Sequence, residues 1–259
     1  MRILAVGDVV GGPGRRLLEA FLPDLRREYR ADFVMVNGEN AAHGRGVNET
    51  IAAGWLENLR VDVITTGNHA FDVRGMDAFF HSEPRLLRPA NWPPDTPGNG
   101  YIKLHTATGE TALVINLIGR IGMATPADCP FRAADSILAK ERADVILVDM
   151  HAEATSEAQA IGRYLDGRVS AVLGTHTHVP TLDAKILPGG TAYVTDIGMT
   201  GPYLGVIGMD TNAALSRFLR ARGDKWSVAE GDPQLHAFFL ETQGRRALRL
   251  ERVIRTLGG

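Results

Sequence analysis

Short apolar runs alternate with amphipathic stretches through the first two-thirds of the chain, and this alternation constrains the fold more than any other feature. Short β-branched runs predict buried strands at residues 3–6, 33–36, 61–65, 145–148 and 171–173. Apolar residues at helical spacing predict helices at residues 15–30, 51–59, 133–142 and 157–165. Residues 101–104 and 111–118 predict a hairpin. The pattern as a whole predicts a layered α/β fold with parallel strand pairs.

The last third of the chain changes character. Turn signals such as Pro188-Gly189-Gly190 separate the strands that we predict at residues 184–187, 192–195, 236–241 and 247–254. One further helix is predicted at residues 213–220. Because the sequence has no Ser-, Gly- or Pro-rich linker and no repeat, we expect a single domain over residues 1–259.

Charge and composition exclude several classes of partner. A formal net charge of −2 gives no global basic footprint, so we expect no stable binding to duplex nucleic acid. Cys129 is the only cysteine, so nothing indicates a disulfide framework or an oxidising compartment. No segment approaches the roughly 20 apolar residues of a membrane helix. We therefore expect a soluble, cytoplasmic protein with no membrane partner.

Polar residues with metal-binding side chains follow five of the predicted strands directly. They are Asp8; Asn37, Glu39 and Asn40; Asn68 and His69; Asp149 and His151; and His176 and His178. In open α/β sheets, ligands bind outside the carboxyl ends of the strands. If these strands are parallel neighbours, their ends meet on one rim, and the constellation predicts a metal site.

Each of these residues taken alone also has a purely structural interpretation. Asp8, Asn40 and Asn68 can cap a helix or shape a turn, and His151 can be a hydrogen-bonded core histidine. His176 and His178 are a stronger signal, because residues i and i+2 of an extended segment point to the same side. The coincidence at five strand ends favours the metal site over turn chemistry.

The motifs resemble the calcineurin-like metallophosphoesterase superfamily. Gly67-Asn68-His69 and the His176-Thr177-His178 pair match its pattern, and Asp8 and His151 match in position and order. The usual histidine two residues after the first Asp is absent, since the sequence reads Asp8-Val9-Val10. Glu39, followed by Asn40, replaces the usual second Asp.

With these departures, the chain resembles one branch of the superfamily, the YmdB-like phosphodiesterases. The segments "GDVVG", "GNHAFD", "GTHTHVPT" and "TDIGMTGP" carry the likeness, which extends over essentially the whole chain. The resemblance implies a four-layer α/β/β/α sandwich with mixed sheets. It also implies two divalent metal ions, iron or alternatively manganese, and hydrolysis of cyclic nucleotides, with 2′,3′-cyclic forms preferred and 3′,5′-cAMP as a second candidate.

The same resemblance implies a role for each motif residue. One metal would be held by Asp8, Glu39, Asn40 and His178, and the other by Glu39, Asn68, His151 and His176. Glu39 would bridge the two ions, and Asn40 would take the place of the missing histidine. A hydroxide that bridges the metals would attack phosphorus, and His69 would donate the proton to the leaving oxygen.

The residues themselves agree with such chemistry. Mixed carboxylate, amide and imidazole ligands suit divalent iron, manganese or zinc, and the absence of cysteine ligands disfavours a closed structural zinc site. Asp72, three residues after His69, can orient that imidazole or can cap a helix. His43 and Arg45 can contact a phosphate or base, or can belong to a solvated loop.

Other interpretations and contacts stay open. Amidohydrolases also carry His-x-His, but after their first strand. A non-catalytic, metal-bound nucleotide sensor and a phosphodiesterase or phosphatase of another substrate are the remaining alternatives. Phe71, Trp92 and Tyr203 are candidates to stack on a base, and the sequence leaves open whether the chain forms a homo-oligomer through residues 195–202 or the Trp92 loop.

Overall fold

A computed structural model of the chain describes residues 1–221 and 226–257. Its first sheet has six strands in the order β10-β11-β1-β2-β3, with β12 paired to β11. The bounds are β1 Arg2–Val6, β2 Phe33–Asn37, β3 Val63–Thr65, β10 Gly201–Pro202, β11 Pro233–Gln243 and β12 Arg246–Thr256. The strands β1, β2 and β3 are parallel, whereas β11 is antiparallel to its neighbours, so the sheet is mixed.

The second sheet also has six strands, in the order β4-β5-β6-β7-β9-β8. The bounds are β4 Tyr101–His105, β5 Thr111–Ile118, β6 Val145–His151, β7 Ala171–Thr175, β8 Lys185–Ile186 and β9 Ala192–Val194. The inner strands β5, β6, β7 and β9 are parallel, and the predicted hairpin is the antiparallel pair β4 and β5. This sheet is therefore mixed as well.

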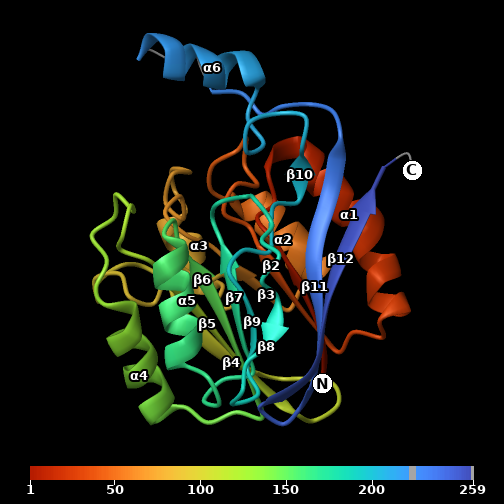
Figure 1. Cartoon of the computed structure of the whole chain (residues 1–259), viewed down its shortest axis with the longest axis vertical. Helices are drawn as coiled ribbons and strands as arrows, with labels where there is room; N and C mark the ends of the chain where they lie inside the picture. The colour runs from red at the N-terminus through yellow and green to blue at the C-terminus, as the bar shows by residue number, and fades with distance from the viewer. Residues whose placement is uncertain (222–225, 258–259) are drawn as a thin grey trace.

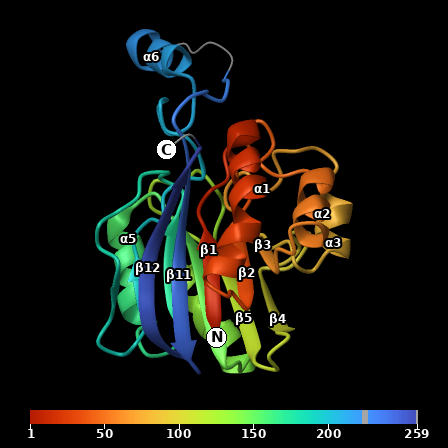
Figure 2. The same cartoon turned by 90° about the vertical axis from the view of Figure 1, so that its right-hand side faces the viewer.

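Helices cover the outer face of each sheet, except the last helix, which projects away from them (Figures 1 and 2). Their bounds are α1 Gly11–Glu28, α2 Glu49–Glu57, α3 Asp77–Ser82, α4 Pro130–Lys140, α5 Thr155–Tyr164 and α6 Thr211–Arg220. In Figure 2, α1, α2 and α3 lie on one side of the stacked strands and α5 lies on the other.

Three apolar clusters separate the layers. One joins the first sheet to α1, α2 and α3, through side chains such as Leu18, Trp55 and Phe80. A second lies between the two sheets and contains Phe238 from β11 and Leu147 from β6. The third joins the second sheet to α4 and α5. Burial of these alternating faces confirms the predicted four-layer α/β/β/α sandwich with mixed sheets.

Every predicted strand and helix is present, but some boundaries differ. Helix α1 begins at Gly11 rather than at residue 15. The Gly-Gly-Pro-Gly stretch, which is typical of a turn, forms the first helical turn, where the missing N–H of Pro13 costs no hydrogen bond. The elements α3 and β10 were not predicted, because six and two residues are too few to show a periodic pattern.

Residues 195–202 are buried throughout, so the prediction that they offer an interface surface is wrong. Backbone hydrogen bonds explain their burial: Thr200 N–H donates to the carbonyl of Asp8, and Val10 N–H donates to the carbonyl of Thr200. The segment thus lies against the turn that follows β1. Within the described residues, none of the helices is long and apolar enough to cross a membrane.

Helix α6 projects from the body of the molecule (Figure 1). Its buried side chains are Ala213 and Ala214. Leu215, Phe218 and Leu219 on the same helix are exposed. The helix therefore contributes little to the three apolar clusters.

Buried His236 on β11 makes the stability of this fold depend on pH. Its ring stacks on Tyr203 with centroids 4.8 Å apart, and burial together with the nearby charge of Arg252 lowers its pKa to about 4. The unfolded chain keeps the ordinary pKa near 6.5, so between pH 6.5 and pH 4 it binds a proton that the folded chain excludes. The contribution of neutral His236 to the free energy of unfolding is fully present above pH 6.5. It decreases as the pH is lowered from 6.5 to 4.

We predict that the wild-type free energy of unfolding falls more steeply than that of His236→Gln between pH 7 and pH 4. Over the whole window, the free energy of unfolding should change by up to about 3 kcal/mol more in the wild type than in the variant, and urea denaturation at a series of pH values measures the difference. Parallel pH profiles for the two proteins would contradict the buried neutral state of this histidine.

Candidate metal centre

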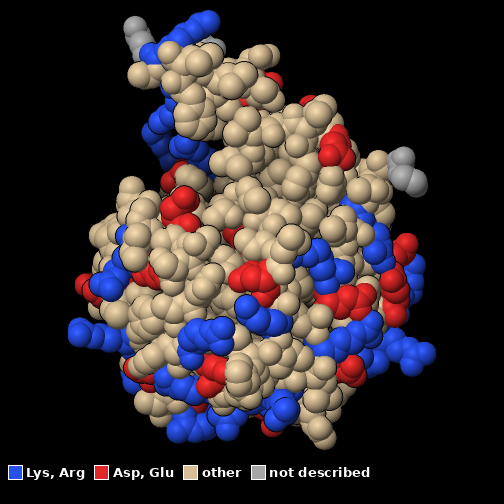
Figure 3. Space-filling view, in the orientation of Figure 1, with Lys and Arg blue, Asp and Glu red and all other residues tan. Residues whose placement is uncertain are grey.

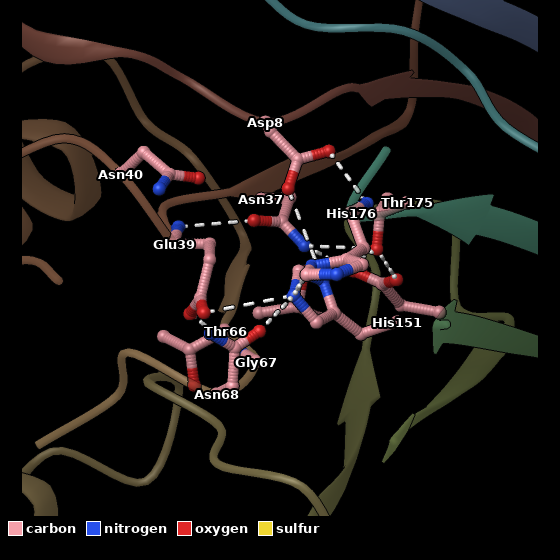
Figure 4. A network of polar contacts seen from close by, with 12 residues as sticks. Asp8, Asn37, Glu39, Asn40, Thr66, Gly67, Asn68, His151, Thr175 and His176 are labelled. Carbon is pink, nitrogen blue, oxygen red and sulfur yellow. Dashed lines mark hydrogen bonds and ion pairs between the residues drawn. The ribbon is translucent and has the colours of Figure 1, made fainter. Parts of the chain in front are cut away.

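The carboxyl ends of strands from both sheets converge on one site (Figure 4). The first sheet supplies Asp8 after β1, Glu39 and Asn40 after β2, and Asn68 and His69 after β3. The second supplies His151 at the end of β6, and His176 and His178 after β7. All eight predicted residues therefore lie along one rim, as we predicted from their positions after the strands.

Two glycines allow close contacts at this rim. A Cβ at Gly67, after β3, would lie 2.1 Å from Cδ2 of His151 on β6. A Cβ at Gly7 would lie 1.8 Å from the carbonyl oxygen of Gly198. Only glycine lacks the colliding atom, so the turn after β3 can approach the His151 ring of the second sheet, and the end of β1 can approach the backbone of the segment between β9 and β10.

A chain of buried hydrogen bonds fixes the tautomer of His151. The Thr175 hydroxyl donates to Asp149 Oδ1 at 2.7 Å, so its oxygen accepts from His151 Nδ1 at 3.0 Å. Asp149 also accepts from Asn37 Nδ2 at 2.9 Å and from the Thr65 hydroxyl. The Nδ1 of His151 therefore carries the proton, and its Nε2 presents a lone pair to the site.

The other two histidines are fixed in the same way. The Nε2 of His176 lies 3.1 Å from Oε2 of Glu153, and the Nδ1 of His178 lies 2.8 Å from the carbonyl oxygen of Ile207. Each of these nitrogens donates outward, which leaves Nδ1 of His176 and Nε2 of His178 without a proton. All three imidazoles thus direct an unprotonated nitrogen inward.

The inward atoms are close together. The Nδ1 of His176 lies 3.1 Å from the Nε2 of His151, and the latter lies 3.1 Å from Oδ1 of Asn68. The Nε2 of His178 lies 3.1 Å from Oδ1 of Asn40, whose Nδ2 donates to the carbonyl of Gly44 and so fixes the amide orientation. Lone pairs therefore face lone pairs, an arrangement that a shared cation stabilises.

Two carboxylates are buried at the same point. Oδ1 of Asp8 is buried with no hydrogen-bond partner and lies 3.8 Å from His151 Nδ1 and 4.0 Å from His178 Nε2. Glu39 accepts backbone N–H groups from Gly67 and His69, one on each oxygen, and each oxygen retains a second lone pair. Its Oε1 lies 3.6 Å from Nε2 of His151.

Burial of these acids is costly unless positive charge accompanies them. Removal from water, together with the nearby charge of Asp149, raises the pKa of Asp8 to about 7. Burial also raises the pKa of Glu39 well above its ordinary value, and the pKa of Asp149 to about 6. A bound divalent cation is the kind of charge that would offset this cost.

Within residues 1–221 and 226–257, no group of three or more His, Cys, Asp or Glu side chains is already arranged as a metal site. Two of the seven predicted ligands are asparagines, which lie outside those residue types. The unpartnered oxygen of Asp8 and the three inward nitrogens fit divalent metal ions nonetheless, because each outward nitrogen already has its own partner.

The prediction that His176 and His178 lie in an extended segment and for that reason point to the same side is wrong. They do not extend β7, which ends at Thr175, since both have positive φ, 102° and 65°. The turn is held by Asp196, whose Oδ2 accepts from the backbone N–H and hydroxyl of Thr177 at 2.9 and 2.8 Å. His176 consequently contacts His151, whereas His178 contacts Asn40.

His69 stands at the edge of the site with its own carboxylate partner. Its Nδ1 lies 2.7 Å from Oδ2 of Asp72, so the structure favours the orienting role for Asp72. A capping role does not fit, because the next helix, α3, begins at Asp77 and is preceded by Met76. Burial lowers the pKa of His69, and the hydrogen bond to Asp72 opposes that shift.

A cleft opens over these residues. It is lined by Glu39, Asn40, Gly44, Arg45, His69, His176, His178, Ile207, Met209 and Trp226. The aromatic side chains suggested by the sequence lie elsewhere: Phe71 packs against Phe80 and Trp92, and Tyr203 stacks on His236. Sequence reasoning also missed Thr175 and Asp149 as supports of His151, since both belong to apolar strands.

Gly67→Ala tests the contact between the sheets. The added Cβ overlaps the His151 ring, so the ring has to move and the affinity for divalent metal should fall at least about tenfold. Elemental analysis after dialysis at fixed free Mn²⁺ measures the bound metal, and thermal unfolding reports the accompanying loss of stability.

Gly54→Ala is the matched control, because its Cβ would lie 4.0 Å from Nδ2 of Asn58, the nearest atom. This variant should bind metal as the wild type does and unfold at an equal or slightly higher temperature. Equal metal affinity in the Gly67→Ala and Gly54→Ala variants would show that the position of His151 is not critical.

Known proteins resemble this chain over nearly its whole length. The chain is 46% identical over 260 residues to the 2′,3′-cyclic-nucleotide 2′-phosphodiesterase of Bacillus subtilis, covering 98% of this chain and 97% of that protein. A crystal structure of a hypothetical protein from Thermus thermophilus is 46% identical, with a TM-score of 0.93 and 99% of both chains covered. A novel phosphatase from Mycoplasma pneumoniae is 31% identical, with a TM-score of 0.92 over 99% of this chain and 93% of that one.

The family model described as YmdB-like protein matches residues 4–253, which include every residue of the site. The likeness to the solved structures extends over both sheets and over the turns that follow their strands. The chain therefore belongs to the YmdB-like protein family.

Proposed function

We propose that this chain is a dinuclear-metal phosphodiesterase that hydrolyses 2′,3′-cyclic nucleotides, with 3′,5′-cAMP as a second candidate substrate. One observation carries the proposal: three histidines each have an acceptor at the outward ring nitrogen and turn the other nitrogen into the site that contains the buried carboxylates Asp8 and Glu39. The name of the Bacillus subtilis relative supports the substrate class. The proposed active unit is a single domain, and we place it in the cytoplasm.

The proposed ligands divide into two sets that share one carboxylate. One ion is assigned to Asp8, Glu39, Asn40 and His178, and the other to Glu39, Asn68, His151 and His176. We propose iron for both sites, with manganese as the alternative. When bound, such ions lower the pKa of water and neutralise charge on phosphoryl oxygens.

The protein contributes a limited negative charge to this centre. Asp8 and Glu39 supply two negative charges, while the amides and the neutral histidines supply none. Two divalent cations would leave the site positive, and a phosphodiester monoanion would be attracted to it. The low formal charge of the ligand set is therefore suited to an anionic substrate.

His69 is the proposed proton donor. In hydrolysis of a 2′,3′-cyclic phosphate, a water oxygen bonds to phosphorus and gives up one proton, the bond from phosphorus to O2′ breaks, and O2′ takes up a proton. His69 lines the cleft, and Asp72 holds its Nδ1, which leaves Nε2 to deliver that proton. The product is then a 3′-nucleotide.

We predict that His69→Ala lowers kcat for 2′,3′-cyclic AMP by about 10²- to 10⁴-fold and leaves the metal content unchanged. Steady-state kinetics and elemental analysis of the same preparation measure the two quantities. His81→Ala, which changes an exposed histidine on α3, is the control and should match the wild type in both. Loss of metal from His69→Ala would make His69 a ligand instead.

A panel of 2′,3′- and 3′,5′-cyclic nucleotides with Fe²⁺ or Mn²⁺ tests the activity itself. Turnover of 2′,3′-cyclic nucleotides to 3′-nucleotides is the expected result. Binding of metal and nucleotide without any turnover would favour the non-catalytic sensor.

A further inference from the structure

Trp226 stands out in the wall of the cleft, because it is the only Trp, Tyr or Phe among the described residues that line it. It comes from the segment between α6 and β11, far in sequence from every predicted ligand. It is 36% exposed, whereas Trp55 is buried in the core and Trp92 packs against Phe71. An exposed tryptophan beside a polar site is a candidate surface for a planar ligand.

Its ring partners are two arginines. The guanidinium carbon of Arg45 lies 5.9 Å from the Trp226 ring centroid, and that of Arg217, on α6, lies 5.4 Å from it. Figure 3 shows Lys and Arg side chains gathered below the projecting α6, with Asp and Glu side chains directly beneath them. Positive charge and an aromatic face thus lie together at the mouth of the cleft.

Arg45 is attached to the metal centre by a short, well-defined loop. Gly46 N–H donates to the carbonyl of Glu39, and Gly44 N–H donates to the carbonyl of Asn40. Arg45 therefore sits close to two proposed ligands. Among the described residues it has no carboxylate partner, and its charge is near enough to lower the pKa of His69.

We propose that Trp226 is the base-stacking residue of this site and that Arg45 contacts the phosphodiester when a nucleotide is bound. This inference rests on the function proposed above. A base that stacks on Trp226 from the cleft takes the place of Arg45, and the freed guanidinium turns to the phosphate. Arg45 and Trp226 both line the cleft, so their contact lies where a substrate enters.

The expected contributions to affinity favour this exchange of Arg45 for a base on the Trp226 ring. Stacking of one base on an aromatic side chain contributes about five- to 150-fold in affinity, whereas an exposed contact between arginine and an aromatic ring contributes about two- to fivefold. An arginine that leaves the ring for a phosphate also gains a charge-assisted hydrogen bond. Purines offer a larger face than pyrimidines, so the geometry predicts a preference for purine substrates.

Trp226→Ala and Trp226→Phe test the assignment with two substrates. For 2′,3′-cyclic AMP, Trp226→Ala should raise KM by about 10- to 100-fold at nearly unchanged kcat, and Trp226→Phe should retain most of the wild-type KM. For glycerol 1,2-cyclic phosphate, which has no base, all three proteins should have similar kinetics. Circular dichroism and thermal unfolding verify that the variants fold.

Equal losses on both substrates, or no loss on cyclic AMP, would overturn the stacking role. A loss of the wild-type ratio between purine and pyrimidine kcat/KM in Trp226→Ala would support it further. Arg45→Lys keeps the charge but not the planar fork, so it should weaken both substrates alike.

Binding without turnover separates this inference from the proposed reaction. The product 3′-AMP should quench the tryptophan fluorescence of the wild type, and Trp226→Phe should lose that quenching. Quenching that persists in Trp226→Phe would overturn the inference even if the enzyme is active. Quenching confined to the wild type would support it even if no cyclic nucleotide were hydrolysed.

Discussion

The close contact between the carboxyl ends of the two sheets is the constraint on which the site depends. The first sheet carries both buried carboxylates and both asparagines, and the second carries the three histidines. Neither set is a metal site by itself. They share one centre because Gly67 leaves room for the His151 ring. A side chain at Gly67 would hold the two halves apart.

The second contact of each histidine then gives the centre its chemical character. Thr175, Glu153 and the Ile207 carbonyl each hold an outward nitrogen, so the inward nitrogens carry lone pairs. Asp8 contributes an oxygen that has no hydrogen-bond partner. Burying such acceptors together is unfavourable without a cation. The same surroundings account for the raised pKa of Asp8, which reaches about 7.

Local patterns predicted a layered α/β fold and polar residues gathered at strand ends, whereas the four-layer arrangement and the proposed ligand set were implied by the family resemblance. An apolar run followed by a polar residue marks a strand end, and parallel strands bring such ends together. The sequence did not predict that Asp149 supports His151 from within β6, or that Trp226 lines the cleft, because both depend on tertiary contacts and not on a local pattern. The backbone conformation of His176 and His178 could not be predicted either, because their positive φ values depend on contacts with Asp196.

Diffraction at the iron absorption edge, from crystals grown with Fe²⁺, tests the central claim most directly. We expect two anomalous peaks about 3.5–4 Å apart, with the Glu39 carboxylate between them and the His151 ring ligating through Nε2. A single peak, peaks away from the histidines, or a Glu39 side chain that contacts neither ion would contradict it.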